Sequence, residues 1–332
     1  MKVSLEELKN KMLSALEAKG FRGAEADFLV DMYLGGELRG HTSHGLASFA
    51  GFVSQDWSNL DKPKVLKETN AMFMIDAKSN PGAIVGKRAA DEAIARAKKE
   101  GVGTAVVKNM DSWLRPGAIA QYIAEQGFVA LVVNDGGGTS TAPPGGYDPV
   151  LATNPIAYGM PTADQPLVVD MATSKRAWGQ VRLANKYGTD LPEDTFYNDN
   201  GEVTLDPKQA HSVKPFGGHK GFALALFIEM LCGSIVGMDN MMVDTKGVGS
   251  SFGARLEDRG GFIFVIDPDQ TAGDYDYRTA NSDVIERIKA TSALPGQSIR
   301  IPGQEAGRLQ KQREDEGEIE ISDELWEEIP SL

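Results

Sequence analysis

The segment Arg39 to Gly45 contains two of the four histidines of this 332-residue chain, His41 and His44, among small and hydroxyl-bearing residues. It follows a helix-like run, Ala24 to Leu38, and precedes an apolar run. A histidine beside a hydroxyl at the end of a helix can act as a general acid or base near neutral pH. The ordinary alternative is a surface histidine in a loop, and this segment alone leaves both interpretations open.

Two further segments have residue types suited to anion binding. An apolar strand around Asp170 leads into Thr173 and Ser174, which are expected to open a helix whose free backbone amides attract phosphate. Ordinary helix capping by these hydroxyls is the alternative. The segment Pro215 to Gly221 precedes a long apolar helix, and its glycines allow close backbone approach while Lys220 adds positive charge. This second segment favours a ligand site over simple capping.

Several common catalytic patterns are absent from the sequence. Neither Gly101-Val102-Gly103 nor Gly247-Val248-Gly249 lies in a strand–turn–helix unit with a third glycine, so a Rossmann fingerprint is missing. No zinc or calcium pattern occurs, and no Gly-x-Ser-x-Gly turn supports a serine hydrolase. The single cysteine, Cys232, excludes a disulfide framework and is expected to be a small buried apolar residue.

The composition is that of a globular protein, with 41% hydrophobic and 24% charged residues. The net charge of −13 argues against nucleic acid or an anionic membrane surface as a partner. The N-terminus lacks the apolar core of a signal peptide, and no run of eighteen uninterrupted apolar residues occurs. We therefore expect a cytoplasmic protein without a membrane partner.

The hydrophobic pattern predicts an α/β protein with helices near both ends. Residues 4–38 are expected to form two helices separated at Gly20 to Gly23, with Ser4 and Glu7 as a capping box. A polar, prolyl stretch from Lys62 to Thr69 is expected to cross between domains. Strands and helices then alternate, which favours a layer of parallel or mixed strands. The expected strands are 71–76, 102–108, 128–134, 156–160, 167–171 and 261–266, and the expected helices are 81–100, 117–126, one from about 174, 220–236, 281–290 and 303–313, with 184–213 irregular.

Several separated motifs agree with one family. They are Ser43-His44-Gly45, Thr153-Asn154-Pro155, Asp170 to Ser174, Gly217 to Gly221 and Pro302-Gly303-Gln304-Glu305, in the family's order and spacing. Over nearly its whole length the chain resembles the malate/L-lactate/sulfolactate dehydrogenases with a non-Rossmann nicotinamide-binding fold. Within that family, Asn109 to Gly117 and Ile299 to Gly303 look most like 2,3-diketo-L-gulonate reductases.

The resemblance implies a fold and a reaction. It implies a central α/β cofactor domain, at residues 69–245, and a mainly helical second domain built from residues 1–68 and 246–332. It also implies a homodimer and NAD- or NADP-dependent hydride transfer between a 2-keto or cyclic 2-imino acid and its reduced form. The family's acid residue corresponds to His44, with Ser43 beside it. The cofactor-binding segments correspond to Val168, Val169, Asp170, Met171, Ala172, Thr173, Ser174, His219, Lys220, Gly303, Gln304 and Glu305.

The substrate side of the site departs from the family. Many members have an arginine four residues after the histidine, where this chain has Ser48, and a second histidine where it has Ser112. A serine does not replace the forked donors of an arginine toward a carboxylate. Arg115 is then the candidate for that task, with a salt-bridged surface arginine as an equal alternative. Ser48 and Thr153 are expected to line the substrate pocket.

Three functions follow from this reading. The first is an NAD(P)H-dependent 2-keto-acid reductase in which His44 donates the proton. The second is a reductase of cyclic imines such as piperideine- or pyrroline-2-carboxylate, motivated by the two departures. The third is a dinucleotide-binding protein without catalysis. The sequence does not choose between NAD and NADP, since Lys175, Arg176 and Lys186 could each meet a 2′-phosphate.

Overall fold

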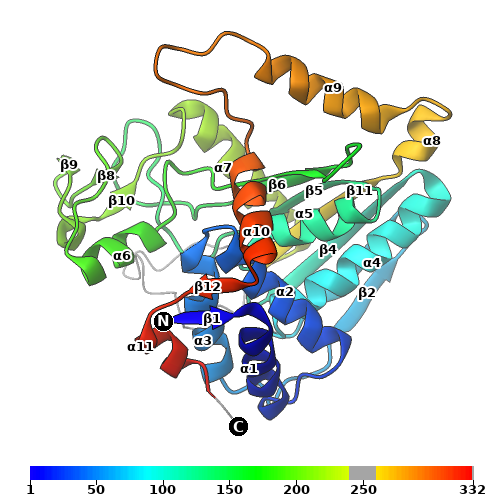
Figure 1. The fold of residues 1–332 in the computed structure, drawn as a ribbon, viewed down its shortest axis with the longest axis horizontal. Helices are drawn as coiled ribbons and strands as arrows, with labels where there is room; N and C mark the ends of the chain where they lie inside the picture. The colour runs from blue at the N-terminus through cyan, green and yellow to red at the C-terminus, as the bar shows by residue number, and fades with distance from the viewer. Residues whose placement is uncertain (239–258, 331–332) are drawn as a thin grey trace.

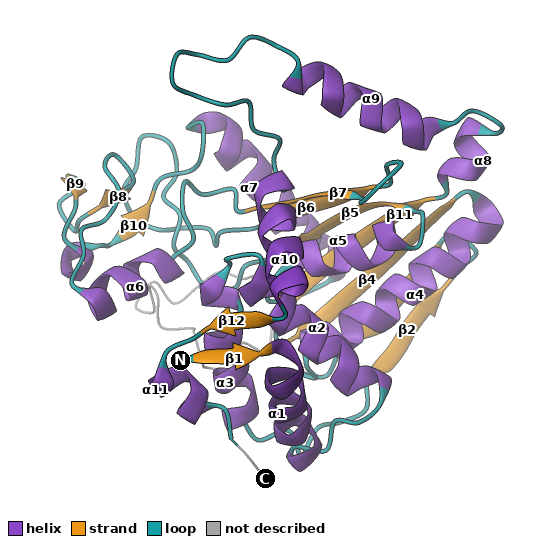
Figure 2. Ribbon diagram, viewed as in Figure 1, coloured by secondary structure: helices purple, strands orange, loops and turns teal. Residues whose placement is uncertain are grey.

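A seven-stranded mixed sheet forms the centre of the protein in the computed structural model, which describes residues 1–238 and 259–330 (Figures 1 and 2). The strand order is β2-β3-β4-β11-β5-β6-β7, and β3 and β4 are the parallel pair while all other neighbours are antiparallel. The predicted mixed α/β layer is therefore confirmed. The strands are β2 (Lys64–Glu68), β3 (Met72–Asp76), β4 (Val102–Met110), β5 (Val129–Asn134), β6 (Ile156–Met160), β7 (Leu167–Met171) and β11 (Arg259–Ile266).

Helices cover both faces of this sheet. Helices α4 (Gly82–Glu100) and α5 (Pro116–Glu125) pack on one face with a run of alanines and isoleucines. The alanines let α4 approach closely, and a Cβ at Gly103 would overlap the backbone of that helix. On the other face, α7 (His219–Cys232) packs Ile228 and Cys232 against β4, β5 and β11, and a short helix, η3 (Ser234–Val236), follows it. Cys232 is a buried free thiol, as expected.

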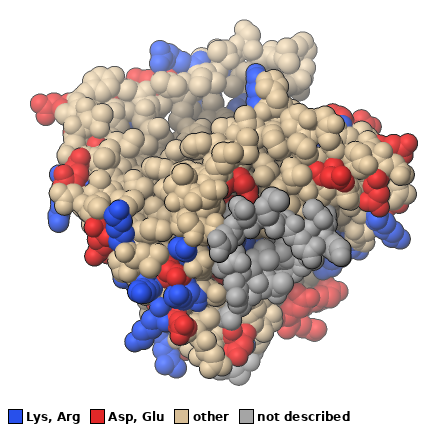
Figure 3. Space-filling view, turned by 180° about the vertical axis from the view of Figure 1, so that it is seen from behind, with Lys and Arg blue, Asp and Glu red and all other residues tan. Residues whose placement is uncertain are grey.

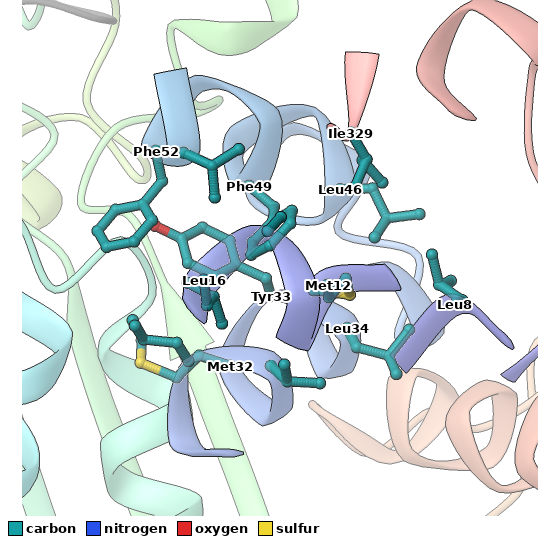
Figure 4. Close-up of a cluster of buried hydrophobic side chains, with 14 of the residues drawn as sticks. Leu8, Met12, Leu16, Met32, Tyr33, Leu34, Leu46, Phe49, Phe52 and Ile329 are labelled. Atoms are coloured by element: carbon teal, nitrogen blue, oxygen red, sulfur yellow. The ribbon is translucent and has the colours of Figure 1, made fainter. Parts of the chain in front are cut away.

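A helical layer lies beside the sheet, built from both ends of the chain. The helices α1 (Leu5–Ala18), α2 (Ala24–Leu38) and α3 (Leu46–Ser54) bury a shared apolar cluster, to which Ile329 contributes from the C-terminal end (Figure 4). The strands β1 (Lys2–Ser4) and β12 (Glu318–Glu320) pair antiparallel, and α11 (Asp323–Glu328) packs on α3. Helix α10 (Gln304–Glu316) lies across α2 (Figure 1). The two predicted N-terminal helices and the Ser4 cap on α1 are confirmed.

Two smaller parts extend from the sheet and the helical layer. Helix α6 (Gly179–Tyr187) packs on a three-stranded sheet of β8 (Phe196–Tyr197), β9 (Val203–Thr204) and β10 (Ser212–Val213), with a short helix, η2 (Pro207–Gln209), between β9 and β10. The stretch 184–213 is thus not wholly irregular. Helices α8 (Pro268–Ala272) and α9 (Tyr277–Lys289) follow β11 (Figure 2). None of the residues of α9 is buried.

Two local predictions from the sequence are wrong. The segment 64–68 is the edge strand β2 and does not only cross between domains. The helix expected from Ser174 begins at Gly179, because Ser174 continues in extended conformation and pairs with Pro215.

The three-part domain division remains a prediction. Its boundary between residues 245 and 246 lies outside the described residues, as does Gly247-Val248-Gly249. The structure places β11, which that division counted with the C-terminal part, in the middle of the central sheet. The elements after residue 303 pack on the N-terminal helices.

One segment of the described chain, His219–Val236, is long and apolar enough to cross a membrane by length and composition. In this fold it is α7 with η3, and its Ile228, Cys232 and Val236 side chains are buried against the sheet. The core helix of a globular protein passes the same test.

Candidate active site

His44 lies in the short helix η1 (Thr42–His44), which connects α2 to α3. The Ser43 hydroxyl and His44 Nδ1 are 2.9 Å apart, so the two residues form the hydrogen-bonded pair that the sequence predicted. Ser48 Oγ donates to the Ser43 carbonyl at 2.7 Å, which uses the Ser48 hydroxyl within this loop. The sequence predicted that Ser48 lines the substrate pocket. In the structure its hydroxyl stabilises the turn that carries His44.

The surroundings of His44 disfavour its charged form. Burial, together with the charges of His41, Arg115 and Arg182, lowers its pKa to about 4. His41 is similar, since burial, Arg115 and Arg39 lower its pKa to about 4. Both imidazoles are therefore neutral at pH 7 in the protein alone. A neutral imidazole can accept a proton, whereas it must first be protonated itself before it can act as a proton donor.

Arg115 lies at the start of α5 and is 5% exposed, which is incompatible with the alternative of a surface arginine. Its guanidinium faces Asp170, and the positive charge of Arg39 lies nearby. Burial lowers the pKa of Arg115 to about 10, so it remains charged. Among the described residues its Nε has no hydrogen-bond partner. A buried donor of this kind next to a histidine is suited to an anionic ligand.

Strand β7 brings the predicted cofactor segments together. At its start, Gly303 has a φ of +78° and lies so close to the Val168 carbonyl that a Cβ there would overlap it. In its centre, Asp170 accepts a hydrogen bond from Gly117 N at 3.0 Å and faces Arg115. Beyond its end, the Thr173 carbonyl accepts from Phe216 N at 3.0 Å, which joins this segment to the turn before α7.

The hydroxyls after β7 are not available as predicted. Thr173 is fully buried, and both its amide and its hydroxyl donate to the Thr153 carbonyl at 2.9 Å. Ser174 is also buried and donates to the Arg176 carbonyl. The next helix begins only at Gly179, so Thr173 and Ser174 do not open a helix, and their part in cofactor binding stays a prediction.

The turn before α7 has the features of an anion site. Gly217 and Gly218 have φ of +54° and +62°, and a Cβ on Gly218 would meet nothing within 4 Å. Helix α7 has no side-chain cap, and His219 and Lys220 are exposed at its first residues. Uncapped backbone amides beside an open glycine turn and a lysine form a cradle for a phosphate group. The observed backbone therefore fits the dinucleotide that the sequence predicted here.

The loop after β5 and the Thr153-Asn154 corner form a closely packed wall. Asn154 is fully buried, accepts from Gly136 N at 3.1 Å and donates to Glu229 of α7 at 2.7 Å. Burial and the charge of Asp135 raise the pKa of Glu229 to about 7, against the effect of the Asn154 hydrogen bond. Burial raises the pKa of Asp135 to about 6, although the Gly137 amide and Arg259 oppose this.

Arg182 is a site residue that the sequence did not indicate. It lies on α6, and its guanidinium reaches to 3.6 Å from where a Cβ on Gly179 would lie. The same Cβ would lie 3.4 Å from Ser43 Cβ, so the start of α6 lies directly against the histidine turn. No local pattern around Trp178 to Arg182 could have revealed this, since α6 and η1 are far apart in the sequence. No group of three or more His, Cys, Asp or Glu side chains suited to a metal ion occurs within residues 1–238 and 259–330.

Comparisons with known proteins show which family this chain belongs to. A family model described as malate/L-lactate dehydrogenase matches residues 3–330. The L-sulfolactate dehydrogenase of Methanothermobacter thermautotrophicus is 30% identical over 335 residues, covering 99% of this chain and 95% of the relative. The chain belongs to the malate/L-lactate dehydrogenase family. It is therefore a nicotinamide-dependent oxidoreductase that acts on 2-hydroxy acids.

Other relatives span the substrates considered from the sequence. The Δ1-pyrroline-2-carboxylate/Δ1-piperideine-2-carboxylate reductase of Pseudomonas putida is 29% identical, over 98% of this chain and 95% of the relative. The 2,3-diketo-L-gulonate reductase of Salmonella typhi is 26% identical over the full length of both chains. The structure of sulfolactate dehydrogenase from Methanocaldococcus jannaschii matches with a TM-score of 0.86 at 28% identity, covering 99% of this chain and 95% of that one, so the predicted fold class is confirmed.

Proposed function

We propose that this protein reduces a 2-keto acid to a 2-hydroxy acid, with His44 as the residue that donates the proton to the carbonyl oxygen. The observation that supports this role most directly is the 2.9 Å Ser43–His44 pair beside the buried Arg115. Ser43 orients the imidazole through its contact with Nδ1. NADH or NADPH, when bound, supplies the hydride to C2. The residues of this chain position the acid and move the proton.

Arg115 is the proposed partner of the substrate carboxylate. Its Nε lacks a hydrogen-bond partner among the described residues, and its charge acts on His44. A carboxylate bound there would offset the positive charges that now lower the pKa of His44, so that His44 takes up the proton it must donate. Binding of an acidic substrate and protonation of the acid are in this way coupled. Ser48 and Thr153 are proposed to line the same pocket.

The cofactor is proposed to bind along β7, at the start of α7 and at the start of α10. The proposed contacts are Val168, Val169, Asp170, Met171, Ala172, Thr173, Ser174, His219, Lys220, Gly303, Gln304 and Glu305. For Thr173 and Ser174 the contact would be steric, because their hydroxyls donate within the protein. For a 2′-phosphate, Lys175 is already bound to Asp194 at 2.7 Å, which leaves Arg176 and Lys186 as the exposed basic residues.

A cyclic imine reductase is the second proposed function. The neutral state of His44 in the protein alone favours it, because a protonated iminium substrate carries its own positive charge and needs no proton from the enzyme. Ser48 and Ser112, which replace an arginine and a second histidine found in many family members, are a further reason to consider a substrate other than a keto acid. The Ser43–His44 pair and the family make a protein without catalysis the weakest of the three hypotheses.

We also propose that the protein is a cytoplasmic homodimer with the three-part domain division given above. Helix α7 exposes apolar side chains on the face turned away from the sheet, namely Leu224, Leu226, Phe227 and Met230, and η3 exposes Ile235. Exposed apolar groups on this scale are typical of a protein interface. The side of the molecule opposite to the view of Figure 1 presents a broad uncharged area between scattered charged groups (Figure 3).

The test is a substrate panel with the wild-type protein and His44→Asn. Oxaloacetate, pyruvate and 3-sulfopyruvate represent keto acids, and Δ1-piperideine-2-carboxylate represents cyclic imines, each with NADH and NADPH. We expect keto-acid turnover that His44→Asn reduces by a factor of about 100 or more, while fluorescence titration shows unchanged cofactor binding. His211→Asn, a change of an exposed-loop histidine bound to Asp148 and Asp199, is the matched control. Turnover of the imine alone, or a His44→Asn variant as active as wild type on the keto acid, would reject the first proposal.

A further inference from the structure

Glu37 is a buried carboxylate beside the active site that the proposed chemistry does not use. It occupies the last turn of α2 and is 7% exposed. Its Oε2 accepts a hydrogen bond from Leu46 N at 3.0 Å, the first residue of α3. The residue before α3 is Gly45, which has no side chain to cap the helix. Glu37 therefore caps α3 from a neighbouring helix, and its charge also favours the positive end of the α3 dipole.

The last turn of α2 contacts the His44–Gly45 peptide directly. A Cβ on Gly36 would lie 2.6 Å from the His44 carbonyl oxygen, and a Cβ on Gly45 would overlap the Glu37 carboxylate. His41 N also donates to the Gly36 carbonyl at 2.9 Å. Gly36 and Gly45 thus permit the last turn of α2 to approach the peptide of His44 closely. Glu37 holds Leu46, two residues after His44, through its hydrogen bond.

Helix α10 supports the same turn of α2 from the other side. Arg313 donates to the carbonyls of Glu37 and Leu38, which end α2, and Arg39 donates to Gln310 at 2.7 Å. A cation at the last carbonyls of a helix stabilises its C-terminus. The contact between α10 and α2 in Figure 1 therefore lies one turn from the histidine segment.

We propose that Glu37, supported by Arg313, is a positioning residue for His44. Its hydrogen bond to Leu46 N sets where α3 begins, and this fixes the η1 turn and the direction of the His44 imidazole toward the substrate. Glu37 does not touch the reacting atoms. The inference rests on the proposed role of His44. A misplacement of about 1 Å at a catalytic group can reduce the rate by a factor of about 100.

Two variants of Glu37 test the proposal. Glu37→Ala removes the acceptor, and we expect kcat on oxaloacetate or Δ1-piperideine-2-carboxylate to fall by a factor of about 10 to 100, with the Kd of NADH and NADPH changed less than about twofold. Glu37→Gln keeps an acceptor oxygen, and we expect it to retain kcat within a factor of about three. Amide hydrogen exchange in residues 41–48 should accelerate in Glu37→Ala and stay near wild type in Glu37→Gln.

Ser322→Ala is the matched control. Ser322 caps α11, which packs on α3, so this change removes a helix cap in the same layer without touching the histidine turn. It should lower the melting temperature and leave kcat unchanged. The proposal is overturned if Glu37→Ala loses only thermal stability, or if exchange in residues 41–48 does not change. If His44→Asn is as active as wild type, the proposed function fails, whereas a defective His44→Asn with a fully active Glu37→Ala rejects only the positioning role.

Discussion

At the scale of single residues, the main feature of the candidate site is which of its basic side chains are protonated. His44 and His41 are half-buried near Arg115, with Arg182 beside His44 and Arg39 beside His41. The two imidazoles and the guanidinium groups that act on them cannot all be charged at low cost, because burial and like charges both penalise protonation. The imidazoles lose their protons and the arginines keep theirs. The positive charge that remains favours an acidic substrate.

This balance predicts the pH dependence of the reaction. Because His44 has a pKa of about 4 in the protein alone, it is a competent base above that pH. For oxidation of a 2-hydroxy acid, kcat/KM should therefore be flat across neutral pH and fall below about pH 4.5. The measurement is kcat/KM from about pH 4 to about pH 9, since this ratio reports groups of the free enzyme. A decline that starts near pH 6.5, the ordinary value for histidine, would contradict the burial argument.

A second prediction concerns Arg115. Replacement by lysine keeps the charge but loses the forked geometry, so kcat/KM for an acidic substrate should fall by a factor of about 10 to 100, mainly through KM. Arg22→Lys, a change of an exposed arginine between α1 and α2, is the control and should leave KM unaltered. Thermal melting of both variants shows whether a loss of substrate binding is accompanied by a loss of stability from the missing Arg115–Asp170 interaction. An unaltered KM in Arg115→Lys would remove Arg115 from the substrate site.

At the scale of secondary structure elements, α7 connects the proposed cofactor site to Asn154, the neighbour of the proposed substrate residue Thr153. Its first turn presents Lys220 and the open glycines, and two turns later Glu229 accepts from Asn154. Asn154 has a φ of +31°, a conformation that non-glycine residues seldom adopt, and its hydrogen bonds to Gly136, Ala225 and Glu229 hold it there. Movement of α7 would therefore reach Thr153, the next residue in the wall.

The buried Glu229 predicts a stability that depends on pH. Burial raises its folded-state pKa to about 7 from the ordinary value of 4.5, so the folded protein binds its proton more tightly than the unfolded chain. That contribution to stability is complete below pH 4.5 and is lost as the pH rises through about 7. Glu229→Gln cannot ionise and still accepts from Asn154. Its melting temperature relative to wild type should therefore rise between about pH 5 and about pH 8.

The control for this measurement is Glu286→Gln on the exposed helix α9. Its melting temperature relative to wild type should be the same at both pH values, because little burial separates the folded from the unfolded environment. The burial argument is wrong if the Glu229→Gln difference is equally independent of pH.

At the scale of the whole molecule, the two ends of the chain return to one layer. The pairing of β1 with β12 and the contact of α10 with α2 place the proposed cofactor residue Gly303 and the proposed acid His44 on connected elements. Two buried clusters, one among the N-terminal helices and one under α4 and α5, then hold this layer and the sheet as a single framework. This closure connects the N-terminal part of the sequence, which carries His44, to the elements that follow Gly303.

The exposed face of α7 predicts the oligomeric state. Phe227 and Met230 are 59% and 54% exposed, although the opposite side of α7 is buried on the sheet. Phe227→Asp should convert the dimer to a monomer in light-scattering chromatography, because a charge in the centre of an apolar interface costs roughly 2 kcal/mol or more. Val203→Asp, an exposed apolar position on β9, is the control that should remain dimeric. A monomeric wild type would refute the proposed dimer.

Much of the fold and the identity of the site could be predicted from local patterns. The capping box at Ser4, the alternation of strands and helices, and the Ser43-His44 pair are properties of neighbouring residues, so short-range spacing reveals them. The same holds for the glycine turn before α7. The failures also had local causes: Thr173 and Ser174 resemble a helix cap, but long-range hydrogen bonds to Thr153 and pairing with Pro215 keep that segment extended.

The tertiary structure alone decided which charges meet. The approach of α6 to the histidine turn, the burial of Arg115 against Asp170, and the cap that Glu37 gives to α3 join residues from different elements. Burial sets the pKa of His44, and burial depends on packing between elements and not on the residues beside it in sequence. The sequence by itself determined the family and suggested His44 as the acid residue. Folding determined the charge state of that residue and the groups that position it, because electrostatic and packing energies depend on distance in space.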